Sequence, residues 1–87
     1  MNNKFRNEIL IEGYLFDSDI DNKIFRVQCE DDVIEFRFND EFHIGVLENL
    51  KGNEIIRIRG SFDCDGNGIF LLAKGILVMP EIERRDN

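Results

Sequence analysis

The chain has very few of the side chains that enzymes use for nucleophilic and acid–base catalysis. It contains one histidine, two serines and no threonine. A nucleophile, its base and an orienting group must lie within hydrogen-bond reach of one another, but His43 is far along the chain from Ser18 and Ser61. The acidic residues fall mainly in expected turns, so no carboxylate pair faces a cleft. We therefore expect a protein that is not an enzyme.

Cysteine and metal-ligating residues are equally scarce. The two cysteines, Cys29 and Cys64, show no CxxC spacing and are accompanied by a single histidine. A structural zinc site needs four ligands of these types, so this set is too small. We expect two unpaired thiols, no bound metal and no cofactor.

Long hydrophobic runs are absent as well. No apolar N-terminal stretch resembles a signal peptide, and no run approaches the length that spans a membrane. We therefore expect a cytoplasmic protein with reduced thiols and no membrane partner. The formal net charge is −7, from 18 acidic and 11 basic residues. This balance argues against non-specific binding to DNA or anionic membranes, which requires a positive surface.

The alternation of polar and apolar residues indicates strands. With 87 residues, of which 43% are hydrophobic, the chain can form one small domain, 1–87,. Its polar ends, 1–7 and 81–87, are expected to be flexible tails. Gly13, inside the first strand, suggests a bulge or a sharp coil there. The five expected strands are Glu8–Phe16, Ile24–Cys29, Val33–Asn39, Glu54–Phe62 and Ile69–Met79.

Between the third and fourth strands the apolar period becomes helical. The residues at this spacing are Phe42, Val46, Leu47 and Leu50. They predict a short helix over Asp40–Leu50, with Asn39 or Asp40 as its cap and Gly52 just past its end. The resulting order is three strands, a short helix and two strands, which is the order of the OB-fold, a five-stranded barrel. Another small five-stranded barrel and an open α+β sheet remain alternatives.

The last third of the chain resembles a known group of domains. Ile-Arg-Ile-Arg-Gly-Ser-Phe, an Asp-Gly-Asn-Gly turn and Leu-Leu-Ala-Lys-Gly-Ile-Leu-Val look like the end of OB domains of the bacterial single-stranded-DNA-binding and tRNA-anticodon-binding type. Gly13 matches a glycine often present early in such domains. The resemblance covers residues 8–80 in layout and residues 55–78 in motif. It implies that an oligonucleotide or a protein partner binds on the barrel face, and it transfers no particular binding residue.

A calcium loop is the alternative interpretation of one turn. Asp63-Cys64-Asp65-Gly66-Asn67-Gly68 matches the first six positions of an EF-hand loop, but Lys74 stands where the bidentate glutamate belongs,. Asp17–Asn22 is a weaker match of the same kind. Asp, Asn and Gly are also the residues that turns favour for backbone reasons. We expect two hairpin turns at these places and no metal site.

The arginines within the expected strands are the main functional signal. If the second and third strands pair with Asp31 and Asp32 at the tip, Arg26 lies opposite Arg37 on the outer face, and Gln28 lies opposite Glu35. Two like charges opposite each other cost up to ~1 kcal/mol, which a bound anion would relieve. In an OB barrel the first strand lies between the second and fourth, so Tyr14 and Phe16 would have arginines on both sides.

Aromatic rings flanked by arginines are the groups that single-stranded nucleic acid needs. Bases stack on rings at roughly 1–3 kcal/mol each, and guanidinium groups hold phosphates. We therefore predict a non-enzymatic OB-fold module that binds single-stranded nucleic acid. Its expected site consists of Tyr14, Phe16, Arg26, Arg37, Arg57 and Arg59.

A protein-interaction module is the alternative function. Acidic turns complement a basic protein surface and would speed its encounter. Phe5, Leu10, Tyr14 and Phe16 could form an exposed apolar patch on the first strand. An inhibitor, an antitoxin or an accessory subunit would fit this composition. Glu12 and Glu35 share the outer face and could also pair with the arginines in an ordinary salt-bridged exterior.

Overall fold

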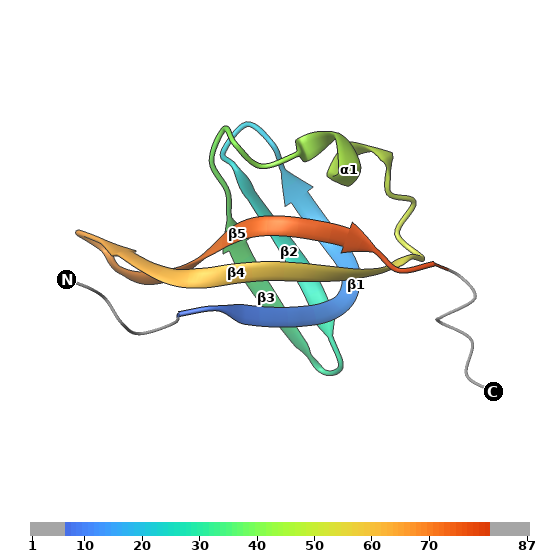
Figure 1. Ribbon diagram of the computed structural model, residues 1–87, viewed down its shortest axis with the longest axis horizontal. Helices are drawn as coiled ribbons and strands as arrows, with labels where there is room; N and C mark the ends of the chain where they lie inside the picture. Colours follow the sequence, from blue (N-terminus) through green and yellow to red (C-terminus); the bar gives the residue numbers. More distant parts are fainter. Residues whose placement is uncertain (1–6, 81–87) are drawn as a thin grey trace.

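The computed structural model describes residues 7–80, and in them five strands close into a barrel (Figure 1). The order around the barrel is β1-β2-β3-β5-β4. Only β3 and β5 pair in parallel, through a single bridge between Arg37 and Leu72. The prediction of a small OB-like barrel with one short helix between the third and fourth strands is confirmed. The elements are β1 (Ile9–Asp19), β2 (Ile24–Cys29), β3 (Asp32–Arg37), α1 (Ile44–Asn49), β4 (Ile55–Asp65) and β5 (Gly68–Val78).

Alternate residues of the strands point inward and form the core, as a period of two requires. The ring of Phe25 lies at its centre, with centroids 5.3 Å from Phe36 and 5.6 Å from Phe42. Phe42 precedes α1, and it is buried in the core together with Leu47 of the helix. Figure 1 shows α1 at one end of the barrel. The buried core residues are Phe25, Val27, Phe36, Phe38, Phe42, Leu47, Ile56, Ile58 and Ala73.

Strand β1 is shared between two walls of the barrel. Its first half pairs with β4 as far as Tyr14, and its second half pairs with β2 from Tyr14 onward. Gly13 allows the close approach at this junction, because a Cβ there would overlap the carbonyl oxygen of Gln28. The expected bulge lies elsewhere: the register shifts between Leu15 and Asp17, so Phe16 is the extra residue.

The helix is shorter than its apolar spacing predicted. It begins at Ile44, and its N-cap position is His43, which makes no side-chain capping hydrogen bond. The prediction that Asn39 or Asp40 caps the helix is wrong. The Asn39 side chain instead accepts a hydrogen bond from the N–H of Glu41 at 3.0 Å and forms a separate turn ahead of the helix,. Gly52 has φ of 98°, so a glycine turn does follow the helix.

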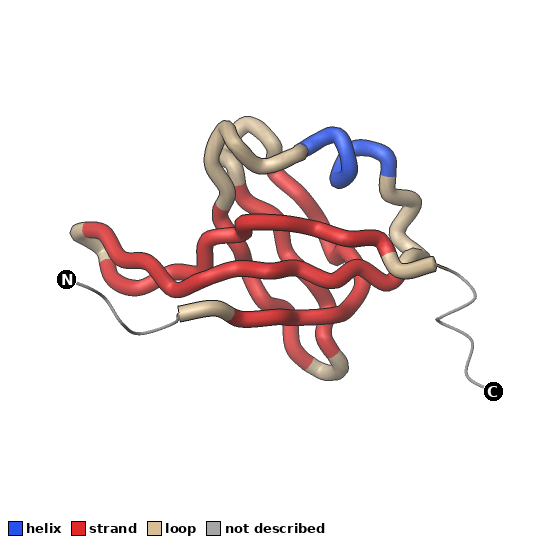
Figure 2. The backbone as a smooth tube through the Cα atoms, viewed as in Figure 1, coloured by secondary structure: helices blue, strands red, loops and turns tan. Residues whose placement is uncertain are grey.

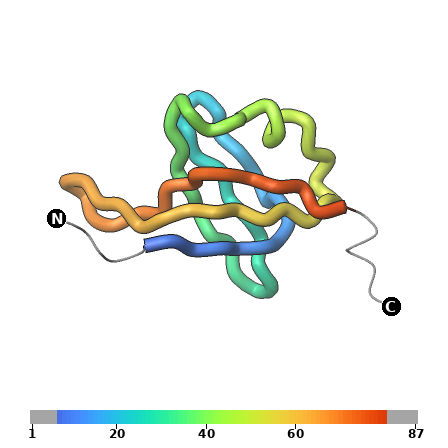
Figure 3. Tube along the Cα trace, in the orientation of Figure 1, coloured from blue at the N-terminus to red at the C-terminus, as the bar shows by residue number. Residues whose placement is uncertain are grey.

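Strands β4 and β5 continue beyond the barrel as a projecting hairpin, Ser61–Leu72, which we call the arm (Figure 2). The sequence placed its turn at Asp63–Gly68, but the strands pair out to Asp65 and Gly68. Asn7, assigned to a flexible tail, is anchored to the base of the arm through Phe62. Figure 3 shows β1 beginning beside this base. The rest of the two predicted tails, together with Phe5, lies outside the described residues.

Candidate functional site

Arg26 lies on the outer wall formed by the second half of β1, by β2 and by β3. Its Nη1 donates to both carboxylate oxygens of Asp17, at 3.1 and 2.9 Å. Its Nε lies 3.4 Å from Glu35, the residue directly opposite on β3. The predicted register, with Arg26 opposite Arg37 and Gln28 opposite Glu35, is therefore wrong. Arg26 has carboxylates on both sides and needs no external anion.

Arg37 is used to hold the arm. Its Nη1 donates to Asp65 at 2.9 Å, and its guanidinium carbon lies 4.1 Å from the centroid of the Phe70 ring. The backbone N–H of Asn67 and the Arg37 guanidinium keep the pKa of Asp65 below its usual range. This arginine bridges β3 to the tip of the hairpin, on the same outer face as Asp65 and Phe70.

Arg57 and Arg59 lie on the other wall, which is formed by the first half of β1, by β4 and by β5. Arg57 is 2.6 Å from Glu12, the residue opposite it on β1. Arg59 has the longest ion pair of the four, 3.7 Å from Glu8. Its guanidinium lies across Gly75, whose missing side chain leaves that space free; a Cβ there would be 3.1 Å from Nη2.

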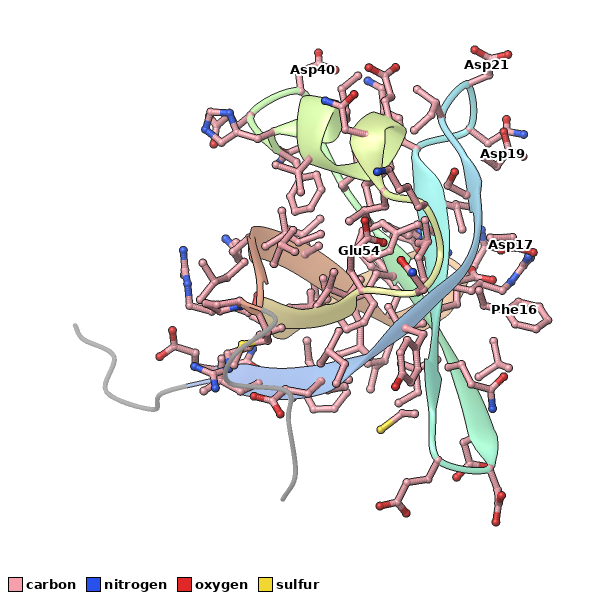
Figure 4. The ribbon with its side chains drawn as sticks, turned by 90° about the vertical axis from the view of Figure 1, so that its right-hand side faces the viewer. Phe16, Asp17, Asp19, Asp21, Asp40 and Glu54 are labelled. Atoms are coloured by element: carbon pink, nitrogen blue, oxygen red, sulfur yellow. The ribbon has the colours of Figure 1, made fainter. Side chains whose placement is uncertain are left out.

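The two predicted stacking rings are exposed, but only one projects freely from a wall. Phe16, the extra residue of the bulge, is 56% exposed, and its ring points away from the barrel (Figure 4). Tyr14 is 45% exposed at the junction of the walls, paired with Gln28 on β2 and with Ile55 on β4. Arginines were expected on both sides of these rings. Arg26 lies opposite Asp17, which follows Phe16, and Tyr14 has an arginine two residues along from its partner on each neighbouring strand: Arg26 on β2 and Arg57 on β4.

The six predicted site residues are thus divided between two walls. In Figure 1 β4, β5 and the start of β1 cross in front of β2 and β3. Phe16, Arg26 and Arg37 belong to the rear β1–β2–β3 wall, Arg57 and Arg59 belong to the front β1–β4–β5 wall, and Tyr14 lies where the two walls meet. The functional assignment of these residues remains a prediction.

The two walls differ in charge. Residues 14–37, which form the β1–β2–β3 wall and its loops, contain seven carboxylates and three basic side chains. The segments 7–13, 55–61 and 73–78, which form the other wall, contain two carboxylates and three basic side chains. The negative charge of the protein is therefore concentrated on the wall that carries Phe16.

A surface groove of about 420 Å³ lies on the acidic wall, and its lining includes Asp17, the residue after Phe16. Asp17, Asp19 and Asp21 line it, together with Arg26. Figure 4 shows Asp17, Asp19 and Asp21 along the same edge of the molecule as the Phe16 ring. An aromatic ring beside several carboxylates can accept an apolar group and a cationic group at once.

The arm carries exposed apolar residues that the sequence did not single out as a site. Phe62 is 53% exposed and Ile69 is 76% exposed. Apolar and polar residues continue to alternate through Asp63–Asp65, which was interpreted as a turn. This alternation was the sequence signal that could have indicated the longer hairpin. The EF-hand-like stretch is part of this hairpin, and its carboxylates already have protein donors. Asp63 accepts from the N–H of Cys64, and Asp65 accepts from the N–H of Asn67.

Within residues 7–80, no group of three or more His, Cys, Asp or Glu side chains could hold a metal ion. Cys29 and Cys64 are free thiols, as expected. No helix in this part of the chain is long and apolar enough to cross a membrane. The chain matches no protein-family model and no curated protein sequence.

Proposed function

We propose that this protein is a non-enzymatic OB-like module that binds a basic segment of a partner protein on its β1–β2–β3 wall. One observation carries the proposal: an exposed Phe16 ring projects from the wall that, together with its loops, carries seven carboxylates and three basic side chains. Such a combination supplies an apolar anchor within a negative field. The anchor provides binding energy at the centre of a contact, and the field steers a positive partner toward it.

The groove beside Phe16 supports this choice of ligand. Asp17 is shared with Arg26, whereas Asp19 bonds only to the neighbouring Asn22, at 2.8 Å and 3.3 Å. A lysine or arginine of the partner entering this groove would meet three carboxylates, two from the end of β1 and one from the turn that follows it. Charge-assisted hydrogen bonds of this kind are stronger than neutral ones.

Single-stranded nucleic acid is a second candidate. The exposed rings of Tyr14 and Phe16, with Arg26 close by, support it, because bases stack on such rings and arginines bind phosphate,. OB domains of the single-stranded-DNA-binding and anticodon-binding type, which the chain resembles, use rings and basic groups in this way. Phosphates would, however, have to displace Asp17 and Glu35 from Arg26 and approach a wall with excess negative charge.

Arg26→Gln distinguishes the two ligands, because it removes one positive charge and releases two carboxylates. For a basic protein partner we expect affinity to rise about two- to fivefold; for an oligonucleotide we expect it to fall by at least as much. Arg57→Gln on the opposite wall, which also leaves one glutamate unpaired, is the matched control and should change neither affinity.

The measurements need a purified partner and a labelled oligonucleotide. Proteins captured from the source cells by wild type, but lost with Phe16→Ala, would be purified and titrated by calorimetry. A labelled 12-nucleotide single strand would be titrated by fluorescence anisotropy at low salt, where nucleic-acid binding is strongest. A captured partner that is acidic, or one whose affinity responds to Arg57→Gln as much as to Arg26→Gln, would contradict the proposed wall.

A further inference from the structure

The two backbone edges of the arm differ in whether other parts of the chain form hydrogen bonds with them. Beyond Gly60, β4 has no β1 residue paired with it, and β5 has β3 beside it only at Leu72. A two-stranded hairpin therefore leaves two rows of backbone groups that no strand covers in residues 7–80. Uncovered edges are where another strand can pair.

The β4 edge is closed by side chains. Asn7 Nδ2 donates to the carbonyl oxygen of Phe62 at 2.7 Å, and the N–H of Phe62 donates to Asn7 Oδ1 at 2.9 Å. This carboxamide forms the two hydrogen bonds that a peptide group of a neighbouring strand would form. One step further, the N–H of Cys64 donates to the Asp63 carboxylate at 2.8 Å. An approaching strand finds no free N–H at either residue.

The hydrogen bonds between Asn7 and Phe62 also determine the direction of the backbone N–H and C=O groups on β5. Because the N–H and C=O of Phe62 face Asn7, the antiparallel pattern makes Phe62–Leu71 and Cys64–Ile69 pairs without mutual hydrogen bonds,. The N–H and C=O of Ile69 therefore point away from β4, toward the open edge. Ile69 has no strand beside it on that side in the described part, and no side chain closes the edge there as Asn7 does at Phe62.

The side chains on the two faces of the arm indicate which residues an added strand should carry. Ile69, Cys64 and Phe62 lie on one face by alternation, and Ile69 is the most exposed large apolar side chain described. Asp63 and Asp65 lie on the other face. A strand along β5 would place successive side chains on alternate faces. Apolar residues would then cover Ile69, and long basic side chains on the other face would extend across Phe70 toward the two carboxylates of β4.

We propose that the β5 edge of the arm at Ile69 binds an extended segment of a partner protein, in which apolar and basic residues alternate, as an added β-strand. A second copy of this chain is the less suitable occupant. Pairing two arms through their β5 edges would place Asp63 and Asp65 of both copies on one face of a four-stranded sheet, on molecules that each carry a net charge of −7. The repulsion between two negatively charged molecules opposes such a contact.

This inference rests on the proposed function for the identity of the partner, and it extends the binding surface from the β1–β2–β3 wall to the arm. The premise can be checked in the free protein by amide hydrogen exchange. The Ile69 amide should exchange at least about tenfold faster than that of Phe70, whose N–H points into the hairpin. Equal protection of the two amides would overturn the open edge.

The binding test uses a synthetic acetylated peptide, Lys-Val-Lys-Val-Lys-Val-amide, with Lys-Lys-Lys-Val-Val-Val as a control of identical charge and composition. Wild-type protein should show amide shift changes centred on Gly68–Leu71 with the alternating peptide, and at least about fivefold weaker binding of the control. Ile69→Pro, which removes the outward N–H, should weaken binding about tenfold. Ile69→Val keeps the N–H and should bind as wild type does, and circular dichroism would verify that both variants fold.

Three results would overturn the inference: no binding of the alternating peptide, equal binding of both peptides, or undiminished binding to Ile69→Pro. Shift changes confined to Phe16, Asp17 and Arg26 would also overturn it, while leaving the proposed function of the wall intact. Changes at Ile69 with none on the wall would support the inference, because this short peptide is designed to pair with the arm alone; the proposed function of the wall is tested separately with Arg26→Gln.

Discussion

The guanidinium carbon of Arg37 lies 4.1 Å from the centroid of the Phe70 ring, and this contact joins the barrel to the arm. The same side chain reaches Asp65 at 2.9 Å. A two-stranded hairpin is only marginally stable in water. The contacts of Arg37 therefore help to hold the arm in a fixed orientation. Arg37 belongs to β3, which pairs with β5 at a single position.

Replacing this arginine should loosen the arm without unfolding the barrel. We expect Arg37→Ala to lower the free energy of unfolding by only about 0.5–1.5 kcal/mol, because both the ion pair and the cation–π contact are partly exposed to water. Amides of the arm should exchange faster, while those of the core strands keep their protection. Arg57→Ala, which removes an ion pair from the barrel wall, is the control and should leave exchange in the arm unchanged.

The same contact makes the arm sensitive to acid. The Asn67 N–H and Arg37 hold the pKa of Asp65 below its ordinary value of 3.8. A lowered pKa in the folded state means that the carboxylate contributes its full stabilisation above about pH 3.8. That contribution is lost as the pH falls through the lower, folded-state pKa.

Carboxyl NMR titration would measure this effect. We expect Arg37→Ala to raise the pKa of Asp65 only part of the way to 3.8, since the Asn67 N–H remains. The pKa of Asp40, which Lys23 lowers, is the internal reference and should not move. An unchanged pKa of Asp65 in the variant would contradict the contact.

Gly13 should tolerate no side chain. A Cβ at this position would overlap the carbonyl oxygen of Gln28, which belongs to a paired strand and cannot move independently. We expect Gly13→Ala to destabilise the protein by about 2–3 kcal/mol in chemical denaturation. Gly45→Ala is the matched change, because nothing lies within 4 Å of its Cβ and it is helical. It should stabilise the protein by about 0.5–1 kcal/mol.

Asn7 should protect the β4 edge from self-association. Asn7→Ala removes both hydrogen bonds to the Phe62 backbone and exposes that edge. We expect a loss of about 1 kcal/mol of stability and an increase in oligomers with protein concentration, measured by light scattering. Asn49→Ala, which removes a single bond to Gly45 within the helix, should not produce oligomers. A monomeric Asn7→Ala would show that Asn7 does not guard the edge.

The alternation of apolar residues was sufficient to predict the strands and the faces they bury. Phe25 and Val27 point inward as expected, and Phe36 meets them from β3. The helix limits were less accurate, because Phe42 has helical spacing but reaches the core from a turn ahead of α1. A buried ring gives the same sequence signal whether a helix or a loop carries it.

The register of β2 and β3 could not be obtained from that alternation. The predicted and observed registers differ by two residues, and a shift of two leaves every side chain on the same face,. The turn decides between them. Cys29 pairs with Asp32 around a two-residue loop in which Glu30 has φ of 58°. Glutamate is an unusual residue for that conformation, so the sequence did not indicate a turn centred on Glu30 and Asp31 in place of Asp31 and Asp32.

Composition and periodicity determined a small five-stranded barrel with few catalytic groups and an excess of acidic side chains, because burial of alternate apolar residues depends on local pattern alone. The tertiary structure decided which charges meet. Arg26 faces Glu35 instead of Arg37, and four arginines are distributed over two walls of opposite character. The position of the β2–β3 turn and the bulge at Phe16 determine which residues pair across the sheet, and these small backbone differences leave no periodic signal in the sequence.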